Sequence, residues 1–417
     1  MAPSSTRKKA AKKALKSIKT SFGKFGLPLE VKFCKKCVIS NQHPSSVVEH
    51  QSKKTDKKPT IHFNANGVCD ACLWAEMKQK TVDWKAREKE LKQLLAKHRR
   101  KDGYYDVLVP GSGGKDSIFA AHILKYKYGM HPLTVTWAPH IYTEVGWQNH
   151  QHWIHSGFDN YLFHPNGQVH RKLTQLAFLN LLHPFQPFIF GQKNFAPKMA
   201  ARFKIPLVFF GENEAEYGNN LKNNFSPFRN WPQIPEKKLY FGGVHINDLP
   251  KHGITKKDLE PYLFPQQKDL DQVGVEVRYL GYYLKWIPQE MYYYAAKHAG
   301  FEVNPYGRTE GTYSKYNSLD DRIDGFHYFT TFIKFGLGRA SYDAAQEIRS
   351  GHLTRDEGVA LVKRYDGEFP QKWFKKILDY MMIDEKTFWK TIDKFRPPHL
   401  WKKTKGKWQL KHAVWKL

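Results

Sequence analysis

The strongest constraint on the fold is a short apolar segment that runs into a glycine-rich turn and then into a helical pattern. Asp106 to Val109 is typical of a strand, Gly111-Ser-Gly-Gly114 of a tight turn, and Ile118 to Tyr128 of a helix. Glycines let backbone N–H groups turn toward an anion, and a helix N-terminus adds partial positive charge. The spacing fits neither a Walker A loop nor a dinucleotide fingerprint. The segment therefore predicts a phosphate-binding loop of another kind.

Short apolar runs alternate with helical patterns on both sides of this loop, which favours an α/β fold with a parallel sheet. The expected strands are 106–109, 133–137, 161–163, 188–190, 206–210 and 275–286. Most of the chain after residue 286 is expected to be helical. Pro288 and Gly300 bracket one helix, and Thr354 with Glu357 forms a capping box that opens another.

Four segments are expected along the chain. They are a basic tail over 1–29, a metal-binding module with a connector helix over 30–100, an α/β domain over 101–285, and a mainly helical C-terminal domain over 286–417. Asp83 is expected to cap the connector helix, which places Leu91, Leu94 and Leu95 on one side.

The charge is unusually positive and lies toward the N-terminus. The chain has 67 Lys plus Arg against 39 Asp plus Glu, a formal charge of +28. The first hundred residues hold 24 of the basic and 8 of the acidic residues, or +16. An excess of basic residues is typical of nucleic-acid binding, but the N-terminal run also suits a solvated tail or a basic amphipathic helix on an anionic membrane.

No apolar run is long enough to span a membrane, and no secretory signal is recognisable. We therefore expect a cytoplasmic protein that can contact the inner membrane peripherally.

All four cysteines fall into two CxxC pairs, Cys34 with Cys37 and Cys69 with Cys72. Two such pairs supply four thiolates to one tetrahedral ion, which suits structural zinc. Redox pairs or buried thiols are the alternatives. If all four thiols bind zinc, no cysteine remains as a glutaminase nucleophile or sulfur carrier.

Two further polar segments are candidates for a ligand site. Glu212, Glu214 and Glu216 follow the strand 206–210, where they could hold Mg²⁺ or a cationic group, or could simply favour a helix N-terminus. The segment 306–317, with Asp320, Asp321 and Asp324 after it, is dense in hydroxyl and charged groups and suits a sugar or a phosphate, although an ordinary exposed loop is the alternative. Trp137 ends the second strand, where it could flank an adenine or belong to the core.

Together with the cysteine pairs, the motifs SGGKDS, GENEAEYG, RTEGTYSKYNSLDDRIDGFHY and GLGRASYDAAQEIRSGHLTRDEG resemble the N-acetyl sugar amidotransferase family. This family belongs to the PP-loop ATP pyrophosphatases, with a HUP-like, Rossmann-type sheet, and to O-antigen and pseudaminic or legionaminic acid pathways. The resemblance runs from about Phe33 to Phe395 and does not cover residues 1–29.

The resemblance also implies roles for residues. Lys115, Asp116, Glu212 and Glu216 are expected in catalysis; Gly111, Ser112, Gly113, Gly114, Ser117 and Trp137 in binding ATP; Asn213, Tyr217, Arg308, Thr309, Glu310 and Lys315 in binding substrate; and Cys34, Cys37, Cys69 and Cys72 in binding zinc. Asp116 would organise Mg²⁺ or the helix start.

The implied reaction converts an N-acetyl group of a nucleotide sugar, such as a UDP-sugar, to an acetamidino group. ATP adenylates the amide oxygen, and ammonia then displaces AMP. The family implies that a separate glutaminase and a cyclase-like barrel supply the ammonia. A PP-loop enzyme that thiolates or amidates a tRNA base is the alternative, and a non-enzymatic nucleic-acid binder is a third. The missing spare cysteine and the glutamate-rich rim disfavour a nucleic-acid partner.

Overall fold

The structure is a computed structural model of the chain, and it describes residues 22–46, 48–51, 57–218, 225–229 and 234–417. Most of the basic tail expected over residues 1–29 therefore lies outside the described residues. Within the described part, Phe25 stacks on Phe395, with ring centroids 5.2 Å apart. The chain thus enters the fold beside its C-terminal region.

Five parallel strands form the central sheet, in the order β3-β2-β1-β4-β7. Their bounds are β1 (Val107–Pro110), β2 (Pro132–Trp137), β3 (Asn160–Phe163), β4 (Leu207–Phe210) and β7 (Glu276–Tyr279). The chain builds outward from β1 through β2 to β3, and then returns to the other side of β1. The strand order therefore reverses between β1 and β4, which is where open parallel sheets form a ligand crevice.

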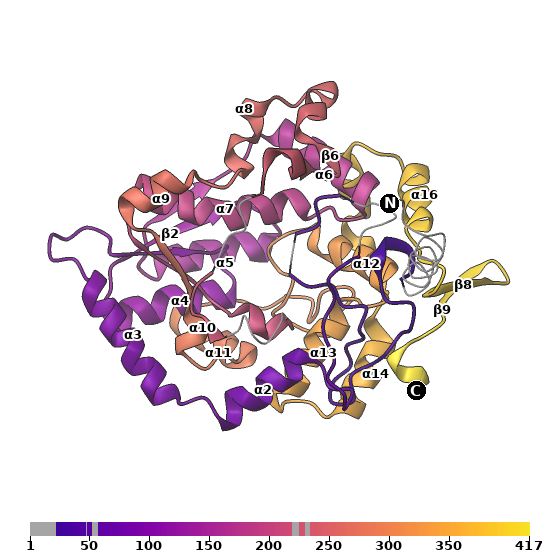
Figure 1. Cartoon of the computed structure of the whole chain (residues 1–417), viewed down its shortest axis with the longest axis horizontal. Helices are drawn as coiled ribbons and strands as arrows, with labels where there is room; N and C mark the ends of the chain where they lie inside the picture. The colour runs from indigo at the N-terminus through magenta and orange to yellow at the C-terminus, as the bar shows by residue number, and fades with distance from the viewer. Residues whose placement is uncertain (1–21, 47, 52–56, 219–224, 230–233) are drawn as a thin grey trace, which may run out of the picture.

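Helices cover both faces of this sheet (Figure 1). They are α4 (Lys115–Tyr126), α5 (Glu144–His155), α6 (Gly167–Leu181), α7 (Gln186–Arg202), α9 (Gln267–Val273) and α11 (Pro288–Ala299). Alternate residues of a strand point to opposite faces. Accordingly, Val107 and Val109 join the core with α4, α5 and α11, whereas Leu108 joins the core with α6 and α7. The α/β fold class expected from the sequence is confirmed.

The strand expected over 188–190 is wrong, because these residues lie inside α7. Phe188 and Phe190 are buried, and so are Phe195 and Met199 further along the same helix. A short apolar run gives no clear periodicity, so a buried helix can be mistaken for a strand. Pro187 in the first turn is the local signal that favours the helix.

The last expected strand is also shorter than predicted. Of residues 275–286, only 276–279 form β7, and α10 (Leu280–Tyr283) follows at once. The other short elements are η1 (Lys24–Gly26), η2 (Glu214–Tyr217), η4 (Glu236–Lys238), β5 (Tyr240–Phe241), β6 (Val244–His245), η5 (Ile246–His252), α8 (Lys256–Leu259), η6 (Glu260–Tyr262), η7 (Gln371–Trp373) and η8 (Val414–Lys416).

The C-terminal region is mainly helical, as expected. It contains α12 (Asp324–Phe335), α13 (Arg339–Ser350), α14 (Arg355–Tyr365), α15 (Phe374–Met381) and α16 (Glu385–Lys394). The capping box of Thr354 and Glu357 is confirmed at the start of α14. A hairpin of β8 (Trp401–Thr404) and β9 (Lys407–Leu410) follows and was not expected.

The N-terminal segment lies beside the C-terminal helices rather than apart from them. Figure 1 shows the indigo segment in front of the orange helices α13 and α14. The four cysteines share a core with Ala344, Ala345 and Val362 of those helices. From there α2 (Asp70–Lys80) and α3 (Trp84–His98) lead back to the sheet, and the expected cap at Asp83 is confirmed by bonds from Lys85 and Ala86 N–H.

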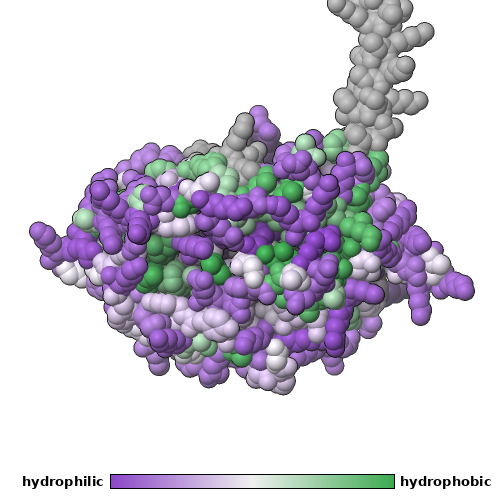
Figure 2. Space-filling model, turned by 90° about the horizontal axis from the view of Figure 1, so that it is seen from below, coloured by the Kyte–Doolittle hydropathy of each residue, from purple (hydrophilic) through white to green (hydrophobic). Residues whose placement is uncertain are grey.

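Hydrophilic side chains dominate the face in Figure 2, with hydrophobic residues in separate patches. Among the described residues, no helix is both long and apolar enough to cross a membrane.

Candidate active site

The loop after β1 needs its glycines for steric reasons. Gly113 has a φ of +86°, and a Cβ there would lie 2.6 Å from the Cα of His150. A Cβ on Gly111 would lie 2.1 Å from the Cβ of Ser117. The Ser117 hydroxyl donates to the Gly114 carbonyl at 2.9 Å, which fixes the first turn of α4. The expected strand, glycine turn and helix are therefore confirmed, with α4 beginning at Lys115 rather than at Ile118.

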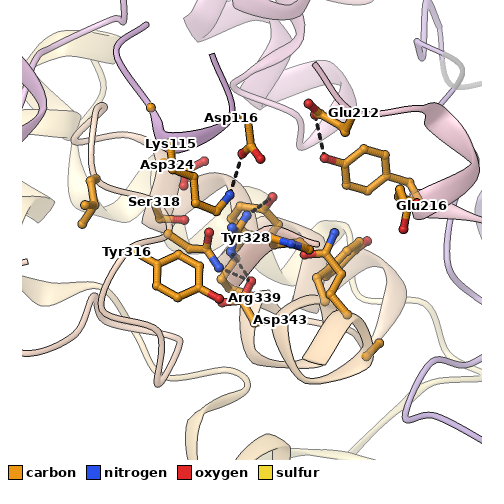
Figure 3. Close-up of a pocket in the computed structure, with 18 of the residues that line it drawn as sticks. Lys115, Asp116, Glu212, Glu216, Tyr316, Ser318, Asp324, Tyr328, Arg339 and Asp343 are labelled. Carbon is orange, nitrogen blue, oxygen red and sulfur yellow. Dashed lines mark hydrogen bonds and ion pairs between the residues drawn. The ribbon is translucent and has the colours of Figure 1, made fainter. Parts of the chain in front are cut away.

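Lys115 and Asp116 open α4 and form a charged pair (Figure 3). The ammonium of Lys115 donates to Asp116 Oδ2 at 2.5 Å, and the indole N–H of Trp286 donates to Asp116 Oδ1 at 3.2 Å. The Lys115 ammonium also lies 5.6 Å from the ring centroid of Tyr316. A carboxylate and an ammonium at a helix N-terminus suit a site for phosphate and a divalent cation.

The glutamates after β4 have different surroundings. Glu212 accepts a hydrogen bond from the Tyr217 hydroxyl at 2.7 Å, and burial together with the nearby Asp116 carboxylate raises its pKa. Glu216 is buried, and both of its carboxylate oxygens accept from Lys78 at 2.9 Å. The Trp74 indole also donates to Glu216, at 3.0 Å. Glu212 thus lies near Asp116, whereas the Glu216 carboxylate is already hydrogen-bonded to Lys78 and Trp74.

Asn213 stabilises the turn that follows β4. Its side-chain oxygen accepts from the Ala215 N–H at 3.0 Å, which caps η2. Its amide nitrogen is buried and has no hydrogen-bond partner among the described residues. Asn213 therefore retains a donor group, and its expected role in binding substrate stays a prediction.

Two cavities meet at the loop. The first has a volume of about 490 Å³ and the second about 560 Å³. Both are lined by Ser112, Gly114, Asp116, Glu212 and Tyr217. The shared residues put the phosphate loop and the carboxylates between two separate spaces, each large enough for a small molecule.

Trp137 lines the second cavity but is only 3% exposed. It packs against Phe163, Phe195 and Tyr262, and a Cβ on Gly191 would lie 2.1 Å from its ring. Gly111 and Ser117 line the same cavity. Trp137 is therefore largely core, and its role beside an adenine stays a prediction.

The C-terminal helices supply a wall of the first cavity that sequence reasoning did not assign. Arg339 pairs with Asp343 at 3.0 Å one turn along α13, and Asp343 also accepts from the Thr312 hydroxyl at 2.5 Å and the Asn317 amide at 3.0 Å. Tyr328, Tyr342 and Arg349 line this wall as well. The spacing of Arg339 and Asp343 was the available signal, but a pair four residues apart usually stays on an exposed helix face.

Two aspartates noted in the sequence reach this cavity. Asp320 and Asp324 both line it, and burial raises the pKa of each. For Asp324 the raised pKa is about 7, because burial outweighs the opposing charge of Arg339 and a hydrogen bond from Ser318. Asp321 instead turns inward and accepts from the backbone N–H of His140 at 2.7 Å.

The residues expected to bind substrate in the loop 308–315 do not line either cavity. Arg308 pairs with Glu368 at 2.7 Å, Thr309 bonds the Asn304 amide at 3.0 Å, Glu310 accepts from the Lys372 N–H at 3.2 Å, and Lys315 lies 5.2 Å from the Tyr292 ring. These contacts hold the loop in place, and the residues just after it, 316–320, line the first cavity. Direct contact of the four residues with a substrate stays a prediction.

The four cysteines come together as a metal-binding site. All four Sγ atoms lie within 4.8 Å of one another, with 3.9 Å between Cys34 and Cys72 and 3.7 Å between Cys37 and Cys69. Four thiolates around zinc at about 2.3 Å require S–S separations of about 3.8 Å. The donor set and its spacing therefore fit a zinc ion. Ile39, His43 and Ala71 of the same module line the first cavity.

Residues 310–414 match the family model described as "LPS biosynthesis protein WbpG-like, C-terminal domain". The match covers Arg339, Asp343 and Arg349, which line the first cavity together with residues of the SGGKDS loop. Over these residues the chain is therefore similar to WbpG-like proteins of lipopolysaccharide biosynthesis.

The other similarities of the chain are partial. The uncharacterized protein MJ1599 of Methanocaldococcus jannaschii is 31% identical over 90 residues, which are 22% of this chain and 31% of that relative. The structure of NMN synthetase from Francisella tularensis is 12% identical with a TM-score of 0.32, covering 74% of this chain and 96% of that one. The U34-tRNA thiolase NcsA from Methanococcus maripaludis, with its 4Fe-4S cluster, is 16% identical with a TM-score of 0.26, covering 73% and 88%. Likenesses of this degree assign no substrate.

We predict about one equivalent of zinc in the folded protein. Removing it with a chelator, or replacing Cys37 with Ser, should lower the melting temperature because folding and metal binding are coupled. Elemental analysis and thermal unfolding measure the two effects. Folded protein with much less than one equivalent, or with iron in its place, would contradict the zinc assignment.

We predict that Glu216 and Glu212 differ in their effect on stability. Glu216→Gln should lower the free energy of unfolding by about 3–5 kcal/mol, because it leaves the buried Lys78 ammonium without its carboxylate. Glu212→Gln should leave stability unchanged or raise it, because it removes a carboxylate whose charged form is disfavoured by burial. Urea unfolding at neutral pH compares them, and equal losses would refute the distinction.

We predict that Asp324 makes stability fall as the pH rises. Its pKa is about 7 in the folded protein and about 4 in the unfolded chain, so between these values the folded state holds the extra proton and unfolding becomes easier with rising pH. Asp324→Asn should therefore raise the melting temperature at pH 8 by about 2–4 °C and have little effect at pH 4. A gain equal at both pH values would contradict this assignment.

Proposed function

We propose that this protein uses ATP to convert an N-acetyl group of a nucleotide-activated sugar to an acetamidino group in the biosynthesis of a surface polysaccharide such as an O-antigen. The observation that carries the proposal is that the SGGKDS loop and the WbpG-like region line one cavity. The loop supports an ATP-dependent reaction, and the family match supports a lipopolysaccharide pathway.

ATP would bind at the loop between the cavities. The backbone N–H groups of 111–114 and the N-terminus of α4 suit its phosphates, and Lys115 would neutralise part of their charge. Gly114 leaves open space, since a Cβ there would meet only the Ser112 hydroxyl, at 3.7 Å. Asp116 and Glu212 offer the oxygen ligands that Mg²⁺ prefers and would hold the ion, whose positive charge would offset that of the phosphates.

The reaction has two steps. The amide oxygen of the N-acetyl group attacks the α-phosphorus of ATP, and pyrophosphate leaves. Ammonia then adds to the amide carbon, and AMP leaves with the former amide oxygen. The amidine retains a proton from ammonia and is a planar cation. The carboxylates of Asp320 and Asp324, which line the first cavity, would stabilise that positive charge in a partly dry site.

Ammonia would come from other proteins. All four cysteines of the chain belong to the metal cluster, so none is left to serve as a glutaminase nucleophile. We therefore propose a glutaminase subunit and a cyclase-like subunit that channels ammonia as partners. The complex would work in the cytoplasm, where ATP and nucleotide sugars occur, with peripheral contact to the inner membrane through the basic N-terminus.

The deciding experiment incubates the protein with ATP, Mg²⁺, an ammonium salt and a panel of UDP-linked N-acetylated sugars, including diacetamido uronic acids. Pyrophosphate release is measured together with the mass of the sugar product. We expect release only with a suitable sugar, and replacement of one amide oxygen by NH. Release stimulated by tRNA and not by any sugar would refute the proposal in favour of a tRNA-modifying enzyme.

We predict that Gly113→Ala lowers pyrophosphate release by about 100-fold, because a shift of about 1 Å in a positioning loop has an effect of that size. The added Cβ would collide with the His150 backbone. Gly307→Ala is the matched control, since Gly307 has a similar φ of +87° but nothing within 4 Å of its added Cβ. Equal losses in the two variants would show that backbone strain, and not the loop position, matters.

A further inference from the structure

Arg349 stands out among the cations of the first cavity. It lies in the last turn of α13 and lines the cavity opposite the phosphate loop. Its Nη2 donates to the Glu216 carbonyl at 3.0 Å, which is the one side-chain hydrogen bond of Arg349 among the described residues. A guanidinium has five N–H donors, so most of them remain for a ligand.

The other two cations of this cavity are already paired with carboxylates. Lys115 binds Asp116, and Arg339 binds Asp343. The Glu216 carboxylate, whose charge also acts on Arg349, forms its ion pair with Lys78. Within the described part of the chain, Arg349 forms no ion pair with a carboxylate. An anionic ligand that enters the first cavity therefore meets one unpaired guanidinium.

Arg349 also interacts electrostatically with the cysteine module. The charge of Arg349 interacts with Cys37, Cys69 and Cys72. Four thiolates exceed the charge of one zinc ion by two units, so the occupied cluster remains attractive to a guanidinium. This attraction offsets part of the cost of burying the guanidinium.

Two rings complete this corner of the cavity. His43, from between the two cysteine pairs, packs on Tyr342 of α13 with ring centroids 4.8 Å apart, and both line the cavity. Burial and the charge of Arg349 lower the pKa of His43 to about 4, so its imidazole is neutral at physiological pH. A neutral ring pair beside an unpaired guanidinium suits a ligand that is part aromatic and part phosphate.

We propose that Arg349 binds the diphosphate of a nucleoside diphosphate-sugar, with the sugar directed toward Lys115 and the phosphate loop. This subsite rests on the proposed function, because it assigns the first cavity to the sugar nucleotide and leaves the second to ATP. Guanidinium and phosphate oxygens form paired, charge-assisted hydrogen bonds, which explains the use of arginine at this position.

The test measures binding of UDP to the zinc-loaded full chain by calorimetry, with the ATP site filled by α,β-methylene-ATP. Arg349→Gln should weaken UDP binding by about tenfold or more, as expected for the loss of hydrogen bonds to a charged group. It should leave the affinity for α,β-methylene-ATP within about twofold. Arg396→Gln is the matched control, because Arg396 pairs with Asp393 and lines neither cavity. That variant should bind UDP as the native protein does.

Further arms make the result specific. Arg349→Lys keeps the charge and should bind UDP with intermediate affinity, and zinc content with the melting temperature shows whether each variant is folded. Uridine lacks phosphate and should bind equally to the native protein and to Arg349→Gln. Unchanged UDP binding in both folded Arg349 variants would overturn the proposal, and so would an equal loss of α,β-methylene-ATP. Glucuronate serves as a probe that carries a carboxylate but no phosphate. If the Arg349 variants lost glucuronate binding and kept UDP binding, the proposal would be overturned in favour of a carboxylate site.

The outcome is separable from that of the proposed function. If UDP binding depends on Arg349 but no UDP-sugar is converted to an amidine, the subsite stands and the reaction is wrong. If the amidine forms and the Arg349 variants bind UDP with the native affinity, the proposed reaction stands and the proposed subsite is wrong.

Discussion

The buried pair of Lys78 and Glu216 connects all parts of the site. The ammonium of Lys78 lies between the Glu216 carboxylate and the Trp286 carbonyl, at 2.9 and 2.8 Å. Through this pair α2 of the cysteine module is fixed to the turn after β4 and to the segment after β7. The carbonyl of Glu216 in turn receives Arg349 from α13. Burying the two charges costs desolvation free energy, but burying either charge without its partner would cost far more. The pair therefore fixes how these elements lie relative to one another.

The sequence was informative wherever local rules decide the structure. The strand, glycine turn and helix around Ser112 follow from the absence of side chains in the turn, and the capping box at Thr354 from hydrogen bonds within four residues. The prediction of a strand over 188–190 was wrong because tertiary packing determines the secondary structure there. Phe188 and Phe190 are apolar because α7 is buried against the sheet, and burial on most sides removes the period that separates a helix from a strand.

In the site, too, the residues that could be predicted are those identified by the sequence next to them, and the others are brought there only by tertiary structure. Lys115 and Asp116 were predictable because they adjoin the glycine loop, and the four cysteines because their spacing matches one ion. Arg349 was not, since more than 200 residues separate it from the loop and its own helix gives no sign of a ligand. The glutamates after β4 were expected to act together, yet Glu216 is neutralised by a lysine from α2, which only tertiary structure reveals.

The distribution of charge inside the molecule differs from that of the whole chain. The chain carries +28, yet Asp116, Glu212, Asp320 and Asp324 line a cavity in which, among the described residues, Arg349 is the one arginine without a carboxylate ion-pair partner. A long polyanion such as RNA would be repelled by these carboxylates, and it would need cations spread along a groove. A small ligand with its negative charge at one end and a group that becomes cationic at the other meets no such conflict. In the proposed complex the diphosphate would lie against Arg349 and the reacting amide would lie near Glu212, Asp320 and Asp324, whose pKa values are raised by burial. A cation formed there would relieve the cost of burying these carboxylates, so the charges of the cavity support the proposed nucleotide sugar as a substrate over a nucleic acid.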